Sequence, residues 1–189
     1  MLTLFIDTHY EEVIIIIYKD GHILDHFEGV SNYRHSEMVM PKLAEIIAKN
    51  SLNINDFKEL IVVNGPGSFT GIRIGVTIAK TIAFCLNIPI KTISSLAIIA
   101  CNLTGEKIVG LREKNGIFGA TFDAENKMIG EPFYLNSEEE LNFQGEIIEK
   151  VTIDYEKVYQ ECQKIVPTNA HQVNPIYIKK IGVLNDQIS

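Results

Sequence analysis

The first third of the chain contains short apolar runs that have the length of β-strands. Residues 3–7, 13–18 and 58–63 form such runs, each bounded by polar residues. The isoleucine run within residues 13–18 lacks the alternation of a half-exposed strand, so it predicts a strand covered on both faces. Asp20 and Gly21 follow it, and both tolerate the positive φ of a tight turn, which predicts a hairpin.

Two longer segments repeat apolar residues at helical spacing. The first begins at His35 and ends near Asn50, and the second covers residues 70–86. A further strand at residues 88–94 and a helix at residues 95–102 follow. On a helical wheel, the first helix has one broad apolar face, formed by Val39, Met40, Leu43, Ile46 and Ile47.

The second half of the chain repeats this order of elements. A strand at residues 107–111, a hairpin around residues 123–127 and a helix start capped by Ser137 are followed by a helix at residues 157–165. Strand, hairpin and helix thus occur twice, which predicts two lobes of related architecture. We expect the lobes to be residues 1–103 and 104–189, with the last segment returning to the first lobe.

Composition and charge restrict the function classes. The chain has 189 residues, of which 46% are hydrophobic, so it can bury a sizeable core. Its net charge of −7 argues against direct binding of nucleic acid. The N-terminus lacks the features of a secretion signal and the apolar runs are short for a bilayer span, so we expect a cytoplasmic protein. Cys85, Cys101 and Cys162 have no metal-ligand spacing and are expected to be buried thiols.

A glycine-rich loop, NGPGSFTGIRIG at residues 64–75, separates a predicted strand from the second helix. A phosphate-binding P-loop requires a lysine where Ile72 stands, and a dinucleotide fingerprint requires one residue fewer before Gly71. The loop is therefore expected to be structural, with a tight turn and a helix cap at Ser68 or Thr70. The residues assigned to this structural loop are Gly65, Pro66, Gly67, Ser68, Thr70, Gly71 and Arg73.

The helix after the loop has an apolar arc of roughly 200°, wider than the stripe of about 100° that covers a sheet. We expect Ile72 and Val76 to face the core, and the opposite edge of the arc to face a partner. The predicted interface consists of Met38, Met40, Ile74, Ile78 and Ile82.

Four motifs together resemble the TsaB (YeaZ) family. They are IDT at residues 6–8, HSEMVMP at 35–41, GPGSFTGIRIG at 65–75 and PIYIKK at 175–180. The family's loop reads close to GPGSFTGLRIG and its helix motif close to HSExLLP. The resemblance covers residues 1–100 well, and the second half matches weakly apart from PIYIKK.

The resemblance implies an α/β fold of the actin-like/Hsp70-like class, with two βββαβα-type lobes and a shortened second lobe. It also implies a non-catalytic subunit in the synthesis of N6-threonylcarbamoyladenosine at position 37 of ANN-reading tRNAs. In that pathway such a subunit pairs with its paralogue TsaD, which carries the metal and the transferase chemistry, and the ATPase TsaE joins them. It forms a homodimer without TsaD and meets tRNA only through the complex.

The sequence departs from nucleotide-binding members of the superfamily. Their first phosphate loop reads like D-x-G-T, whereas Asp7 is followed by Thr8, His9 and Tyr10. The matching segment of the second half, VGLREKNG at residues 109–116, has no Asp where a second metal-facing carboxylate would sit. One carboxylate alone is poorly suited to hold Mg-ATP. We therefore expect no metal, no catalytic residue and no cofactor, with a weak ATP or ADP contact at Asp7 as the open alternative.

Two further functions remain open from the residues alone. A stand-alone actin-fold phosphotransferase or acyl transferase would use the acids Asp7, Glu11 and Glu12 near a cleft. A homodimeric regulatory protein would use the same helices as the predicted partner interface.

Overall fold

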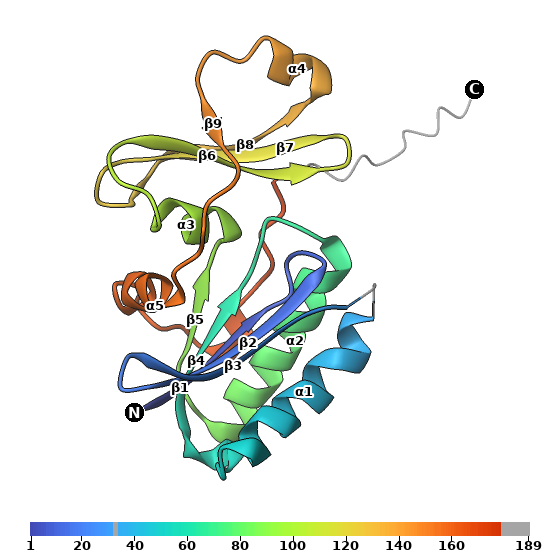
Figure 1. Ribbon diagram of the computed structural model, residues 1–189, viewed down its shortest axis with the longest axis vertical. Coiled ribbons are helices and arrows are strands. Elements are labelled where there is room, and N and C mark those ends of the chain that lie inside the picture. The colour runs from blue at the N-terminus through green and yellow to red at the C-terminus, as the bar shows by residue number, and fades with distance from the viewer. Residues whose placement is uncertain (32–33, 179–189) are drawn as a thin grey trace, which may run out of the picture.

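The computed structural model describes residues 1–31 and 34–178. The structure has two β-sheets, one at each end of the molecule, and the longest helices pack against the first sheet (Figure 1). The first sheet has the order β3-β2-β1-β4-β5. Its strands are β1 (Leu2–Asp7), β2 (Glu12–Lys19), β3 (His22–Val30), β4 (Phe57–Val63) and β5 (Ile90–Ile93).

The predicted hairpin joins β2 and β3. Asp20 and Gly21 form its turn with φ of 52° and 91°, and β2 pairs antiparallel with β3. The isoleucine run of β2 is buried on both faces, as predicted: Ile15 and Ile17 belong to one apolar cluster, and Ile16 belongs to the cluster on the opposite face. Full burial of each such side chain stabilises the fold by about 1.5–3 kcal/mol.

Two long helices lie side by side on one face of this sheet (Figure 1). They are α1 (His35–Lys49) and α2 (Phe69–Leu86), and the short 3-10 helix η1 (Ile54–Asp56) precedes β4. The buried side of α1 consists of His35, Val39, Leu43 and Ile46. Met40, which the wheel placed on the same apolar face, is instead 49% exposed because it lies toward the rim of that face, beside α2.

Two sequence-based expectations about α2 need correction. Among the described residues, α2 is the one helix long and apolar enough to cross a membrane by length and composition alone, whereas no such segment was expected. Its inner side, which includes Ile72, Val76 and Ala79, packs in the core as in a core helix of a globular fold. Cys85, expected to be buried, is exposed near the end of α2, while Cys101 and Cys162 are buried.

The second sheet has four strands and repeats the order of β1 to β4 in the first sheet, without a counterpart of β5 among the described residues. It is arranged as β8-β7-β6-β9, from β6 (Lys107–Glu113), β7 (Gly116–Phe122), β8 (Met128–Asn136) and β9 (Ile147–Ile148). The short helix α4 (Ser137–Leu141) follows β8. Its cap is Asn136 rather than the predicted Ser137, because the Asn136 side chain accepts hydrogen bonds from the backbone N–H groups of Glu138 and Glu139.

Each lobe also contributes a helix to the other. The helix α3 (Ser95–Ala100) packs against β6 and β7 of the second sheet. The helix α5 (Tyr155–Gln163) covers the face of the first sheet opposite α1 and α2 (Figure 1). The 3-10 helix η2 (Ala170–Gln172) then lies against α2. The predicted division at residue 103 falls between α3 and β6 and stays a prediction.

A buried ion pair attaches α5 to the first sheet. Lys91 Nζ lies 2.7 Å from Glu59 Oε2, and both side chains are almost fully buried. Gln163 of α5 accepts a hydrogen bond from Lys91 at 3.0 Å and donates one to Glu59 at 3.3 Å. The hydrogen bonds of Gln163 help to satisfy the buried charges, so α5 and the pair depend on each other.

Candidate functional site

The glycine loop packs against the turn between β1 and β2. A Cβ atom added to Gly67 would collide with the carbonyl oxygen of His9. One added to Gly71 or Gly75 would collide with the carbonyl oxygen or the hydroxyl of Thr8. The three glycines thus allow α2 to approach the backbone of this turn as closely as it does.

Hydrogen bonds fix this contact. The backbone N–H of Ser68 donates to the His9 carbonyl at 2.7 Å, and the Thr8 hydroxyl donates to the Gly71 carbonyl at 2.7 Å. Ser68, rather than Thr70, caps α2, since its hydroxyl accepts from the backbone N–H of Gly71 at 3.2 Å. What the loop holds in this structure is therefore the chain's own β1–β2 turn.

The start of the loop is fastened to α3. Gly65 has a φ of 109°, which favours glycine, and its carbonyl accepts from the Ser95 backbone N–H at 3.0 Å. The Ser95 hydroxyl donates to the Pro66 carbonyl at 2.6 Å and is buried. Both bonds tie the turn that precedes α2 to the start of the helix that reaches the second sheet.

Asp7 is buried at the end of β1 and already has a partner within the chain. Its Oδ1 accepts a hydrogen bond from the His9 backbone N–H at 2.9 Å and lies 2.6 Å from His9 Nδ1. Burial lowers the pKa of His9, but the charge and hydrogen bond of Asp7, with help from Glu12, outweigh it and raise the pKa above its usual value. The nucleotide contact suggested for Asp7 stays a prediction.

The other histidines singled out by their spacing lie apart from this turn. His22 and His26 are exposed on β3. His35 is buried at the first position of α1, where its Nε2 lies 2.7 Å from the Tyr10 carbonyl. Among residues 1–31 and 34–178, no group of three His, Cys, Asp or Glu side chains is placed to hold a metal ion.

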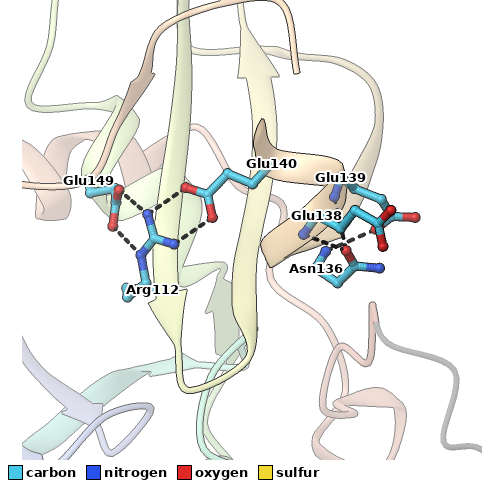
Figure 2. A network of polar contacts seen from close by, with 6 residues as sticks. All are labelled: Arg112, Asn136, Glu138, Glu139, Glu140 and Glu149. Carbon is cyan, nitrogen blue, oxygen red and sulfur yellow. Dashed lines mark hydrogen bonds and ion pairs between the residues drawn. The ribbon is translucent and has the colours of Figure 1, made fainter. Parts of the chain in front are cut away.

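A cleft of about 380 Å³ opens between the two lobes, lined by Tyr10, Glu11, His35, Ser68, Arg112, Glu113, Lys114 and Phe118. The Arg112 guanidinium is already engaged, as Figure 2 shows. It donates to both carboxylate oxygens of Glu140 at 2.7 and 2.8 Å, and its Nε donates to Glu149 at 2.8 Å. The hydrogen bond with Arg112 holds the pKa of Glu140 below its usual range. This cation of the cleft is therefore neutralised within the second lobe.

A second, apolar groove lies on the outer side of α1 and α2. It has a volume of about 520 Å³ and is lined by Ser36, Met40, Phe69, Thr70, Arg73, Ile74, Thr77 and Ile78. Of the residues predicted for an interface, Met40, Ile74 and Ile78 line this groove. Ile82 and Met38 are partly buried against the core, and Met38 also lines a neighbouring pocket with Arg34 and Pro41. Their role in an interface stays a prediction.

An aromatic cluster that sequence reasoning missed surrounds Arg73, one of the residues that line the groove. The Arg73 guanidinium lies 3.7 Å from the centroid of the Phe69 ring, and its Nε donates to the Tyr177 hydroxyl at 2.8 Å. Tyr177 belongs to the PIYIKK motif, whose last two residues lie outside the described part of the chain. The contact joins residues about one hundred positions apart, so no local sequence pattern predicts it.

Comparison with known proteins settles the family. A family model described as "TsaD: tRNA N6-adenosine threonylcarbamoyltransferase" matches residues 16–129, which is more than half of the chain. The "tRNA threonylcarbamoyladenosine biosynthesis protein TsaB" of Bacillus subtilis (strain 168) is 32% identical over 129 residues, covering 68% of this chain and 53% of that protein. The chain belongs to the TsaB (YeaZ) family. The TsaB protein of Escherichia coli (strain K12) is 33% identical over 100 residues, covering 53% of this chain and 43% of that protein.

Solved structures of the TsaB (YeaZ) family share the fold. YeaZ from Pseudomonas aeruginosa superposes with a TM-score of 0.74 at 16% identity, covering 93% of this chain and 100% of that one. A second Pseudomonas aeruginosa structure, described as similar to peptidase YEAZ, gives a TM-score of 0.79 at 16% identity, covering 94% and 99%. The predicted actin-like α/β fold is confirmed. The matched region spans about half the length of the curated relatives.

Proposed function

We propose that this chain is a non-catalytic subunit of the assembly that makes N6-threonylcarbamoyladenosine at position 37 of ANN-reading tRNAs. In this proposal it docks the paralogue TsaD through the outer face of α1 and α2, TsaE joins the pair, and tRNA is met only through the complex. Membership of the TsaB family supports the pathway. The observation that carries the docking role is the apolar groove between α1 and α2.

The shape of α2 supports docking at this face. Val76 and Ile72 are buried in the core, whereas Ile74 and Ile78 line the groove and are only partly buried. Met40 and Phe69, both about half exposed, add apolar surface beside them. Exposed apolar side chains that gather on one face are typical of a surface that another protein covers.

The β1–β2 turn supports a non-catalytic role. In a nucleotide-binding actin-like protein a glycine in this turn would admit a phosphate, whereas here Thr8 and His9 fill the space against the glycines of α2. Asp7 is bonded to His9 rather than open to a ligand. We therefore propose that the chain alone uses no cofactor, with weak ATP or ADP binding confined to the interface of a complex.

Co-purification with TsaD of the same organism tests the proposal. Ile78→Glu should leave a folded chain that no longer retains TsaD, because docking would bury an unpaired carboxylate at a cost of several kcal/mol. Leu24→Glu is the matched control, since Leu24 is an exposed apolar residue on β3, away from the groove. Circular dichroism confirms folding. Retention of TsaD by Ile78→Glu would refute docking at this face.

Cys85 offers a direct readout of the same face. It lies seven residues after Ile78 on α2, close to the same helical azimuth, and is exposed while Cys101 and Cys162 are buried. A maleimide should therefore label Cys85 in the native chain, and bound TsaD should slow that labelling. Unchanged labelling in a complex of confirmed 1:1 composition would place TsaD elsewhere.

A homodimer through the same helices is the second candidate, favoured by the exposed apolar lining of the groove. Sedimentation of the wild-type chain alone should show a dimer that Ile78→Glu converts to a monomer, and TsaD should displace one copy. Calorimetry with Mg-ATP separates both from a stand-alone enzyme. Micromolar binding by the purified chain would favour the enzyme and count against a non-catalytic subunit.

A further inference from the structure

Arg73 lines the α1–α2 groove and is held in place by contacts within the chain. Its guanidinium stacks on Phe69 at 3.7 Å from the ring centroid, and the Tyr177 ring centroid lies 5.7 Å away. The hydrogen bond from Nε to the Tyr177 hydroxyl fixes the direction of the planar group. An arginine restrained in this way loses less conformational entropy when it binds an anion.

The charge of Arg73 has no carboxylate partner in the described part of the chain. The other two arginines are paired: Arg34 lies 3.9 Å from Glu37, and Arg112 is bonded to Glu140 and Glu149. Within residues 1–31 and 34–178, Arg73 donates only from Nε, so both terminal nitrogens have N–H groups left over. A chain with a net charge of −7 thus leaves one oriented guanidinium uncompensated beside an apolar groove.

We propose that the protein that docks in the α1–α2 groove places an Asp or Glu carboxylate on the terminal nitrogens of Arg73. This inference rests on the proposed docking function and adds the chemistry of the partner: an apolar segment for Ile74, Ile78 and Met40, flanked by one acid. Arg73 is the one charged side chain among the described residues that line the groove. A planar guanidinium matches a carboxylate with two parallel hydrogen bonds, so the contact would set the register of the docked segment.

An RNA phosphate fits these observations less well. Binding of a nucleic acid backbone requires several cations in a row. The neighbouring lysine of α1, Lys42, is paired with Glu45 at 2.7 Å. The aromatic face of Phe69 on which a base could stack is covered by the guanidinium itself. A single cation beside apolar side chains is typical of a protein–protein contact.

Tyr177 is the positioning residue of this contact. It touches Arg73 through its hydroxyl and Phe69 through its ring, at 5.4 Å between centroids. The segment that carries it is attached to the rest of the fold independently, since Ile176 N–H donates to the Asn64 carbonyl at 2.8 Å. The proposal therefore assigns to Tyr177 the task of orienting Arg73, which is separate from holding the fold together.

Calorimetric titration of TsaD with the wild-type chain, Arg73→Gln, Arg73→Lys and Tyr177→Phe tests the proposal. Arg73→Gln should raise Kd by about tenfold to a hundredfold, the usual range for losing one member of a desolvated charge pair. Arg73→Lys keeps the charge but lacks the fork, and should fall between wild type and Arg73→Gln. Tyr177→Phe should raise Kd by about threefold to tenfold, because it removes the bond that fixes the guanidinium.

Lys58→Gln is the matched control, since it removes one exposed positive charge at the start of β4, and Lys58 is not among the residues that line the groove. It should leave Kd within about twofold of wild type. Wild-type binding should weaken as salt rises, and the dependence should be smaller for Arg73→Gln than for Lys58→Gln. Circular dichroism of each variant separates loss of binding from loss of fold, and Arg73→Lys remains informative if Arg73→Gln is unstable.

The outcomes are distinguishable. If the wild-type chain fails to bind TsaD, the proposed function itself fails. If the wild-type chain binds and Arg73→Gln binds within twofold of Lys58→Gln, the carboxylate contact is refuted while docking stands. If Arg73→Gln keeps TsaD binding but weakens tRNA binding by the complex, Arg73 serves a phosphate and the proposal is wrong.

Discussion

The two lobes share a strand order but differ in how their helices are held. In the first lobe, α1 and α2 have 15 and 18 residues and bury apolar side chains against the sheet. In the second, the corresponding helix α4 has five residues and buries none of them. Arg112 of β6 instead binds Glu140 of α4 and Glu149, the residue that follows β9 (Figure 2).

The next helix in the repeated order makes the contrast sharper. After β9 the chain supplies α5, which has nine residues and packs against the first sheet rather than the second. All three long or medium helices among the described residues therefore serve the first lobe (Figure 1). Among the described residues, the same strand order thus supports a face of two long helices in one lobe and no helical surface of comparable size in the other.

The largest effect is expected where the first lobe has no room to adjust. Gly71→Val should destabilise the chain by about 4 kcal/mol or more, because the side chain would meet the Thr8 carbonyl, a backbone atom that cannot move aside. Gly105→Ala is the control: nothing lies within 4 Å of its added Cβ, and its φ of 72° alone should cost about 1 kcal/mol. Urea unfolding measures both. An equal loss of unfolding free energy in the two variants would mean that the loop is not tightly packed against the β1–β2 turn.

The buried ion pair of the first lobe should give the next largest effect. Lys91→Met leaves the Glu59 carboxylate buried and unpaired, which typically costs about 3–5 kcal/mol. The double variant Glu59→Leu with Lys91→Met should recover much of that loss, because it removes both charges. Thermal unfolding of the single and double variants checks the difference. A double variant as unstable as the single one would show that packing, rather than the charge, matters here.

A moderate effect is expected at the β1–β2 turn, and it should depend on pH. Asp7→Ala should leave the chain folded but less stable by about 1–3 kcal/mol, since His9 loses its buried acceptor. The raised native pKa of His9 means that the pair stabilises fully below the unfolded value of about 6.5. The difference between wild type and Asp7→Ala should therefore shrink as pH rises through the native pKa of His9. Urea unfolding of both proteins at about pH 6 and about pH 9 tests this expectation. If the difference in unfolding free energy grows with pH, the Asp7–His9 pair does not stabilise the fold in this way.

The smallest effect is expected in the second lobe. Arg112→Met removes an exposed ion-pair network, and exposed pairs contribute little to global stability. The unfolding midpoint should hardly move, whereas amide hydrogen exchange in α4 should accelerate because the link to β6 is gone. A loss of stability as large as that of Lys91→Met would show that ion pairs stabilise the two lobes equally.

Several local features could be predicted from the sequence because neighbouring residues decide them. The Asp20-Gly21 turn follows from the positive φ that both residues tolerate, and the isoleucine run of β2 follows from its lack of alternation. The wheel of α2 separated Ile72 and Val76 in the core from Ile78 at the groove. The helical wheel predicts these faces correctly because α2 is a regular helix, so each side chain points in the direction that its position in the sequence gives.

Other features depended on contacts that no local pattern contains. Ser137 and Asn136 are both good caps, and the course of β8 decided in favour of Asn136. The two-residue strand β9 was missed, since Ile147 and Ile148 are too few to give a periodicity. The exposure of Cys85 depends on which side of α2 the rest of the chain covers.

The glycine loop shows where the division lies. Its residue types alone excluded a P-loop and a dinucleotide site, because both require fixed spacings that the sequence lacks. Only the tertiary structure decided what the glycines hold, since the parallel pairing of β1 with β4 brings Thr8 and His9 beside the loop that follows β4. The contact of Arg73 with Tyr177 was decided in the same way: the sequence supplied the side chains, and the return of the C-terminal segment along α2 brought them together.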